Sequence, residues 1–198
     1  MCLVIPGMWD SPTRYGTLIR RLEAAGRTAV TMALTPASGV PSLERLVPQV
    51  TAQLGLLHDL FGSQGRPIEV VGFSMGALVA LAAIEDRPGW VRTLVSVGTP
   101  HGGTWAALLW PTPCGRDFLP RSAFSRRHAR VPEGTRIGSV ASRRDHIIWP
   151  WRSALHPQAE VTRVVEHGFH PKLPLLLPVQ DALIEVLELL AVPKDQGR

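Results

Sequence analysis

The chain has 198 residues, of which 45% are hydrophobic and 19% charged, and its net charge is +5. This length is enough for one domain that buries well over half of the surface of its unfolded chain. Two cysteines are too few for a disulfide scaffold, and no low-complexity tract or fixed repeat is present. We therefore expect a single domain over residues 1–198.

Short apolar runs alternate with amphipathic stretches along the chain. Strands are predicted over 2–5, 27–32, 68–73, 91–98, 135–141 and 161–166, and helices over 14–26, 41–61, 75–86 and 178–191. Residues 99–134 form a long irregular segment. This alternation predicts an α/β fold, with a mostly parallel sheet of about six strands and helices on both faces. Its functional residues are expected in loops at the carboxyl ends of the strands.

The residues Gly-Phe-Ser-Met-Gly at 72–76 fit the pattern G-x-S-x-G. The pattern lies between a predicted strand and a predicted helix, where it forms a sharp turn that raises the serine hydroxyl above the sheet. Side chains at 72 and 76 would collide with this turn and the neighbouring strands, which glycine avoids. The alternative is a serine N-cap with glycines beside it by chance. The flanking elements favour Ser74 as a nucleophile.

A nucleophilic serine needs a base, because its hydroxyl is barely ionised at neutral pH. In chains of this architecture the order is serine, acid, histidine. His167 and His170 both follow the last predicted strand. We favour His170 as the base, because it lies further into the loop, after a glycine that permits a tight turn. His167 remains the alternative.

The base in turn needs a carboxylate that fixes its tautomer. Asp145 follows the predicted strand 135–141, at the end of the sheet where this acid belongs. Asp117 lies in the irregular segment and Glu166 in or just after the last strand, so both are less favoured. An ion pair with a neighbouring arginine is the alternative role of Asp145.

An oxyanion formed by attack on a carbonyl needs two N–H donors. Met75 directly follows the expected nucleophile, and we expect its main-chain N–H to be one of these two donors. The other is expected from the loop after the first strand, where Gly7 lets the backbone turn closely, and we expect Met8 to supply it. His101 begins a His-Gly-Gly motif that follows a different strand, so it is not assigned this role.

With these features the chain resembles the α/β-hydrolase superfamily, and within it the small bacterial lipases and esterases. The matching segments are 5–26, 70–80, 95–104, 139–150 and 167–178. The resemblance implies an ester hydrolase with Ser74, Asp145 and His170 as its catalytic triad and Met8 and Met75 as oxyanion donors. It also implies a compact sheet, because the chain begins at the strand that matches the third of the family. Family members usually carry His-Gly where this chain has Pro-Gly.

The segment 104–130 is apolar and aromatic, with arginines interleaved. It fits either a lid or pocket wall that accepts acyl chains, or a helical insertion packed on the end of the sheet. Substrate contacts are expected from Trp9, Trp105, Leu108, Trp110 and Trp149.

Positive charge is concentrated over residues 116–152, which contain nine arginines and only three acidic residues. A solvated basic face is the simplest interpretation, and the alternative is a surface that attracts an anionic lipid or substrate. Nucleic-acid binding is not expected, because no helix-turn-helix, zinc or RNP pattern accompanies the charge.

The two cysteines, Cys2 and Cys114, lack metal-ligand spacing, and we expect two free thiols rather than one disulfide. The expected chemistry calls for no metal or organic cofactor. Residues 1–10 lack a basic leader and a long apolar run, and residues 178–192 carry three acidic side chains. We therefore expect neither a signal peptide nor a membrane span, and a soluble cytoplasmic protein.

The function that these residues predict is hydrolysis of a carboxylic ester with an apolar acyl group, through an acyl-enzyme on the serine. An acyltransferase, a thioesterase and a phospholipase are alternatives that use the same triad. A hydrolase-like protein that only binds its ligand is an alternative from another class. The sequence leaves the acyl length, the alcohol and the oligomeric state open.

Overall fold

The computed structural model describes residues 1–166 and 168–192, and within them six strands form one sheet. The strands are β1 Cys2–Ile5, β2 Ala29–Thr31, β3 Ile68–Phe73, β4 Val91–Val97, β5 Arg136–Ser142 and β6 Val161–Val165. All neighbours pair in parallel, in the order β2-β1-β3-β4-β5-β6. The predicted fold class is confirmed, and the sheet is entirely rather than mostly parallel.

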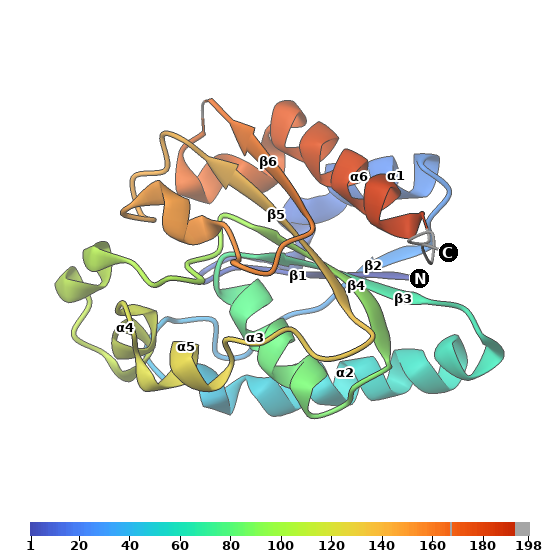
Figure 1. Cartoon of the computed structure of the whole chain (residues 1–198), viewed down its shortest axis with the longest axis horizontal. Coiled ribbons are helices and arrows are strands. Elements are labelled where there is room, and N and C mark those ends of the chain that lie inside the picture. The colour runs from blue at the N-terminus through green and yellow to red at the C-terminus, as the bar shows by residue number, and fades with distance from the viewer. Residues whose placement is uncertain (167, 193–198) are drawn as a thin grey trace, which may run out of the picture.

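Helices cover both faces of the sheet (Figure 1). On one face lie α1 Gly16–Ala24 and α6 Leu177–Ala191, and on the other α2 Val47–Leu60 and α3 Met75–Glu85. The predicted helices over 14–26 and 41–61 each begin with a 3-10 turn, Pro12–Tyr15 and Leu43–Arg45, that precedes the α-helix. Among the described residues, none of the helices is both long and apolar enough to cross a membrane.

Alternate residues of each strand point to opposite faces of the sheet, and both faces are buried. In β1, Leu3 and Ile5 pack in the core under α2 and α3, whereas Cys2 and Val4 pack in the core under α1 and α6. A strand covered on both faces reads as a continuous apolar run, which is why the runs in this sequence predicted a parallel sheet.

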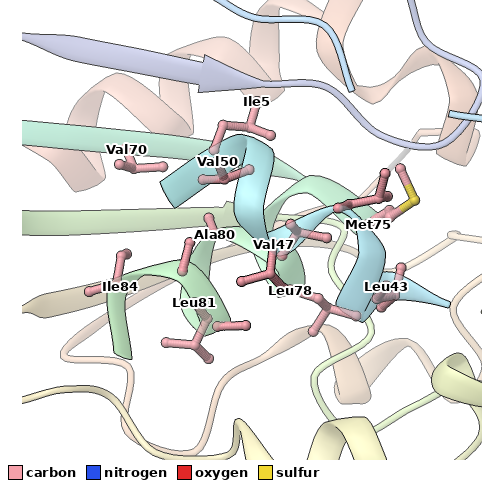
Figure 2. Close-up of a cluster of buried hydrophobic side chains, with 14 of the residues drawn as sticks. Ile5, Leu43, Val47, Val50, Val70, Met75, Leu78, Ala80, Leu81 and Ile84 are labelled. Carbon is pink, nitrogen blue, oxygen red and sulfur yellow. The ribbon is translucent and has the colours of Figure 1, made fainter. Parts of the chain in front are cut away.

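Helix α3 is enclosed by its surroundings, since every residue from Met75 to Ile84 is buried. Figure 2 shows Val47 of α2 beside Leu78 of α3. A helix held in this way between sheet and helix fixes the position of the residue at its N-terminus.

The segment predicted as irregular, 99–134, contains three short helices: the 3-10 helix Trp105–Leu109, α4 Pro113–Phe118 and α5 Ala123–Arg127. Each is capped by a hydroxyl side chain, of Thr104, Thr112 or Ser122, that accepts a hydrogen bond from a main-chain N–H in its first turn. Cys114, Phe118 and Phe124 join the core under α2 and α3, so this segment is packed onto the domain. Both Cys2 and Cys114 are free and buried.

Candidate active site

Ser74 lies at the turn between β3 and α3, at the carboxyl end of a central strand. Its backbone has φ 48° and ψ −118°, a conformation that L-residues other than glycine rarely adopt. The Ser74 N–H donates to the Val97 carbonyl of the next strand at 2.9 Å, which anchors the turn. Strain of this kind persists only where the surroundings enforce it, and it is frequent at functional sites.

The glycines on either side of Ser74 are required by space. A Cβ on Gly72 would lie 2.4 Å from Ala77 Cα, and a Cβ on Gly76 would lie 2.4 Å from the Pro6 carbonyl oxygen. Both distances are far below van der Waals contact. The two glycines therefore allow the strand, the helix and the loop after β1 to approach one another around the serine.

Three side chains predicted from distant parts of the sequence form a continuous chain of hydrogen-bonding contacts. His170 Nε2 lies 2.9 Å from Ser74 Oγ, and His170 Nδ1 lies 2.7 Å from Asp145 Oδ2. The Asp145 side chain is 1% exposed and that of His170 12%. An ionised carboxylate only accepts hydrogen bonds, so the tautomer that fits carries its proton on Nδ1 and leaves Nε2 free to accept from the serine.

The other oxygen of Asp145 is held by the backbone that follows it. Asp145 Oδ1 accepts from the N–H groups of Ile147 and Ile148, at 2.9 and 3.0 Å. With Oδ2 facing His170, both carboxylate oxygens therefore have partners. The residue lies directly after β5, so the strand and this local turn together aim its side chain at the histidine.

The two alternative acids, Glu166 and Asp117, have partners other than His170. Glu166 pairs with Arg143 at 3.1 Å, and within the described residues the ion-pair partner of Asp145 is His170 and not Arg143 or Arg144. Asp117 Oδ2 accepts from Ser42 Oγ at 2.7 Å and from the N–H of the next residue, at the start of a 3-10 turn. His167 lies outside the described residues.

In the loop after β1, the half-buried Met8 has no acceptor for its N–H among the described residues, and neither has the exposed Ser11 at the end of the loop. Pro6 has no N–H. The N–H groups next to Met8 have acceptors: Gly7 donates to Tyr15 Oη at 3.4 Å, Trp9 to the Ala37 carbonyl at 2.8 Å, and Asp10 to the Gly7 carbonyl at 3.4 Å. A free main-chain donor on Met8, beside the serine, fits a ligand-binding role.

The first N–H groups of α3 are also free of intrahelical acceptors, and that of Met75 is the first. The loop after β1 comes close to this helix start, since a Cβ on Gly7 would lie 3.4 Å from Ser74 Cβ. Two free donors, Met8 and Met75, thus flank the serine, and the helix adds partial positive charge at its N-terminus.

A cavity of about 380 Å³ adjoins Ser74 and His170. Its apolar lining comes from Met8, Trp9, Phe73, Val97, Pro100, Ala106, Ala107, Leu109, Trp110, Phe118, Ile147, Ile148, Pro171, Leu173 and Pro174. Its polar lining comes from Asp10, Arg14, Thr104 and His146. A cavity of this size and character suits a small apolar ligand or an acyl group.

The structure divides the predicted substrate residues into two groups. Trp9 and Trp110 line the cavity, and their rings lie edge to face with centroids 4.6 Å apart. Trp105, Leu108 and Trp149 are outside its lining and are 48%, 64% and 65% exposed, so their contact with substrate stays a prediction.

The turn around residues 105–109 explains this division, because side chains three residues apart share a side of a 3-10 helix. Trp105 and Leu108 form one side and are outside the cavity lining, whereas Ala106 and Leu109 form another side that contributes to it, with Leu109 still 86% exposed. The sequence predicts an irregular segment here, so it does not distinguish the side chains on one side of the turn from those on the other. Phe118, a further lining residue, was recognised only as part of an apolar segment.

His101 of the His-Gly-Gly motif lies on β4's loop, with its ring 4.7 Å from the ring of His156. His101 Nε2 is buried without a hydrogen-bond partner in the described part of the chain. Burial, with a smaller contribution from His156, lowers the pKa of His101 well below its ordinary value of 6.5. This environment holds the ring neutral and gives it a packing role.

No group of three or more His, Cys, Asp or Glu side chains in residues 1–166 and 168–192 is arranged to hold a metal ion.

No protein-family model matches the sequence. The chain is 26% identical over 141 residues to a curated relative, the lysosomal thioesterase PPT2 homolog of Drosophila melanogaster, and the match covers 69% of this chain and 47% of the relative. The chain thus spans about half the length of the curated relative that it matches.

Two solved structures illustrate what the fold is similar to. The mature lipase BlEst2 of Bacillus licheniformis superposes with a TM-score of 0.69 at 14% identity, covering 96% of this chain and 91% of that one. Alpha/beta hydrolase domain-containing protein 10 from mouse superposes with a TM-score of 0.65 at 16% identity, covering 96% and 88%. The chain therefore has the α/β-hydrolase fold, as the sequence predicted.

Proposed function

We propose that this chain is a serine hydrolase that cleaves carboxylic esters with an apolar acyl group. The observation that carries the proposal is the run of contacts from Ser74 through His170 to Asp145 beside an apolar cavity. Hydroxyl, imidazole and carboxylate in this arrangement are the parts that acyl transfer to serine needs.

In the first half of the reaction, Ser74 Oγ attacks the carbonyl carbon while its proton moves to His170 Nε2. The imidazolium that results is stabilised by Asp145. The tetrahedral intermediate collapses, the bond to the alcohol oxygen breaks, and that oxygen takes the proton from His170. Water then attacks the acyl-enzyme in the same way, and the carboxylic acid leaves as Ser74 regains its proton.

The negative charge on the carbonyl oxygen is held by the main-chain N–H groups of Met8 and Met75. Their availability supports the assignment, because the residues around Met8, which are Gly7, Trp9 and Asp10, donate their N–H groups to intramolecular acceptors. Loss of one such donor in related sites slows the reaction by about 10²–10³.

The preference for an apolar acyl group rests on the cavity. Leu109, Trp110 and Phe118 of the segment 104–130 contribute to its lining, so we propose that this segment forms a wall of the acyl pocket. Asp10 and Arg14, the charged residues of the lining, pair with each other at 2.5 Å. They therefore offer no unpaired charge to the acyl group.

Thioester hydrolysis is a second candidate, favoured by the name of the curated relative, which is a thioesterase. The same serine attack applies, and the thiol that leaves is more acidic than an alcohol and needs less protonation. The two candidates are separated by kcat/KM values for a butyryl thioester and its matched oxygen ester. Each value is taken relative to hydrolysis by hydroxide alone, and the larger ratio identifies the substrate class.

We also propose that the basic segment 116–152 contacts an anionic lipid surface. Among its nine arginines, Arg127, Arg136 and Arg143 form ion pairs with glutamates, and the other six have no ion pair within the described residues. Leu109, which lines the cavity and is 86% exposed, offers an apolar side chain for contact with the same surface. Co-sedimentation with phosphatidylglycerol vesicles but not with phosphatidylcholine vesicles is expected, and equal binding to both would refute the charge-based contact.

The function is tested by Ser74→Ala with p-nitrophenyl butyrate as substrate. Removing the nucleophile of a serine triad lowers kcat by about 10⁶-fold, so no turnover above background is expected. Ser63→Ala is the matched control, because Ser63 is an exposed serine in the turn that precedes β3, at the opposite end of that strand from Ser74. Activity retained in Ser74→Ala would reject the proposed function.

A further inference from the structure

Arg14 joins two loops that meet at the cavity. It lies in the 3-10 turn Pro12–Tyr15, and its Nη1 donates to Asp10 Oδ1 at 2.5 Å. Its Nη2 donates to the Pro171 carbonyl at 2.6 Å. Asp10 lies in the loop that carries Met8, and Pro171 directly follows His170. One guanidinium therefore links the loop of the expected oxyanion donor to the loop of the expected base.

Tyr15 extends this link into the backbone. Its hydroxyl donates to Asp10 Oδ2 at 2.7 Å and accepts from the Gly7 N–H at 3.4 Å. The ring is fully buried and lies edge to face with Phe73, the residue before Ser74, at 5.0 Å between centroids. The contacts thus run without a break from Gly7, through the Tyr15 hydroxyl and Asp10, to Arg14.

The two loops need such a link because neither is held by the ladder of the sheet. Residues 6–11 follow β1, and His170 and Pro171 begin the short 3-10 turn His170–Leu175, so neither segment is part of the sheet. Pro6 further removes one backbone donor from the first loop. A planar guanidinium with two fixed donor directions is suited to hold two acceptors at a set separation.

We propose that Arg14 is a positioning residue, which through Asp10 and Tyr15 sets the separation between the Met8 N–H and His170. The proposal rests on the proposed function. The Arg14 side chain is 35% exposed and that of Asp10 10%, so the ion pair itself contributes little to stability. Its effect is on geometry, since a shift of about 1 Å in a reacting group slows catalysis by about 10²-fold.

The test compares Arg14→Met with Arg20→Met, using p-nitrophenyl butyrate. Arg20 lies on the following helix, is exposed, and makes its side-chain bond only to Thr17 within the described residues. The concentration of active sites is determined by titration to completion with a fluorophosphonate, and kcat is calculated from that concentration. Misfolded protein therefore does not lower the measured kcat. We expect kcat of Arg14→Met to fall by about 10²-fold with KM within a factor of about two, and Arg20→Met to equal the parent chain.

Arg14→Lys and Asp10→Asn extend the test to variants that keep more of the native contacts. Lysine keeps the charge and reaches one acceptor, so part of the lost kcat is expected to return. Asp10→Asn breaks the same link from its other side and should lower kcat per titrated site in the same direction. A purely structural role would lower the thermal midpoint and the titrated fraction while kcat per site stays constant.

Tyr15→Phe tests whether the contacts act as one unit. If they do, Arg14→Met combined with Tyr15→Phe loses less kcat than the product of the two single losses, because the link is already broken in each. If the loss of kcat in the double variant equals the product of the two single losses, the contacts do not act as one unit. Unchanged kcat in Arg14→Met would overturn the proposal, and so would a change confined to KM, which would make Arg14 a substrate-binding residue.

Failure of this inference is distinct from failure of the proposed function. If Ser74→Ala keeps its activity, the function is wrong whatever Arg14 does. If Ser74→Ala is inactive and Arg14→Met is fully active, the hydrolase proposal stands and the positioning role of Arg14 is rejected.

Discussion

The turns at the two ends of the sheet differ in how closely neighbouring atoms approach the backbone. At the amino end, the turns that lead into β2, β3, β4 and β5 use glycine at positive φ, and a Cβ added there would meet no atom within 4 Å. Those glycines are Gly26, Gly65, Gly89 and Gly134. Glycine adopts this conformation without steric cost, so these turns carry no strain.

At the carboxyl end, strain and close approach are concentrated around the cavity. Ser74 and Trp9 take positive φ values of 48° and 60° although neither is a glycine. Gly72 and Gly76 have ordinary φ but no room for a side chain. The contrast teaches that the strained end of this sheet is the end where side chains for chemistry gather, as is common in enzymes.

The largest effect that would sharpen this contrast comes from Asp145→Asn. An amide can present its NH₂ to His170 and favour the wrong tautomer, so kcat for p-nitrophenyl butyrate should fall by about 10⁴-fold. Glu166→Gln is the control, because Glu166 is a surface acid paired with Arg143. Its kcat should not change, and an equal loss in both variants would remove the special role of Asp145.

A second test compares glycines from the two ends. Alanine at Gly76 would drive its Cβ into the Pro6 carbonyl and displace the loop that carries Met8. We expect unfolding free energy to fall by about 3 kcal/mol, together with a large loss of kcat. Alanine at Gly134, with φ 82°, should cost about 1 kcal/mol and leave kcat unchanged. Urea denaturation measures the unfolding free energy of each variant, and parallel kinetics measure its kcat. Equal losses of kcat in the two variants would contradict the difference between the two ends of the sheet.

A smaller effect is expected from pH, through His101 and His156 in the loops that follow β4 and the 3-10 turn Trp151–Ala154. Burial lowers the pKa of both below the ordinary value of 6.5. Below pH 6.5 the unfolded chain therefore binds protons that the folded chain excludes, so stability falls as pH falls. Urea denaturation at pH 7.5 and 5.0 should show this fall, and a smaller one in His101→Asn. An identical pH dependence in that variant would contradict it.

The smallest expected effect concerns the chemical reactivity of the two cysteine thiols. Burial is the largest of the causes that raise the pKa of both Cys2 and Cys114 to about 12. Because the thiolate is the reactive form, neither should react with iodoacetamide at pH 8 while the chain is folded. Mass spectrometry should find unmodified protein with full esterase activity. Rapid alkylation of either thiol would show that the segment containing it opens in solution.

The sequence was sufficient for the features that depend on local pattern. Residues 68–73 were predicted as a strand and form β3 with the same bounds, because a strand buried on both faces is continuously apolar. Ser74, Asp145 and His170 could be selected because each directly follows, or lies in the loop after, a strand whose carboxyl end faces the same edge.

The features that were missed depend on contacts between distant segments. Arg14 and Asp10 form an i,i+4 pair that looks like any surface ion pair, and only the fold brings the Pro171 carbonyl to the same guanidinium. The short helices within 99–134 have capping hydroxyls but too few turns for an apolar period to be recognised. For that reason the sequence does not distinguish the side chains of this segment that line the cavity from those that face solvent.

The central claim is that the hydroxyl of Ser74 is made nucleophilic by His170 and Asp145. Its most direct test is intact-protein and peptide mass spectrometry after treatment with a fluorophosphonate probe, on the parent chain and on His170→Ala. We expect one adduct, on the peptide containing Ser74, with labelling at least about 10³-fold slower in His170→Ala. No adduct, an adduct on another residue, or equal labelling rates in the two proteins would contradict the claim.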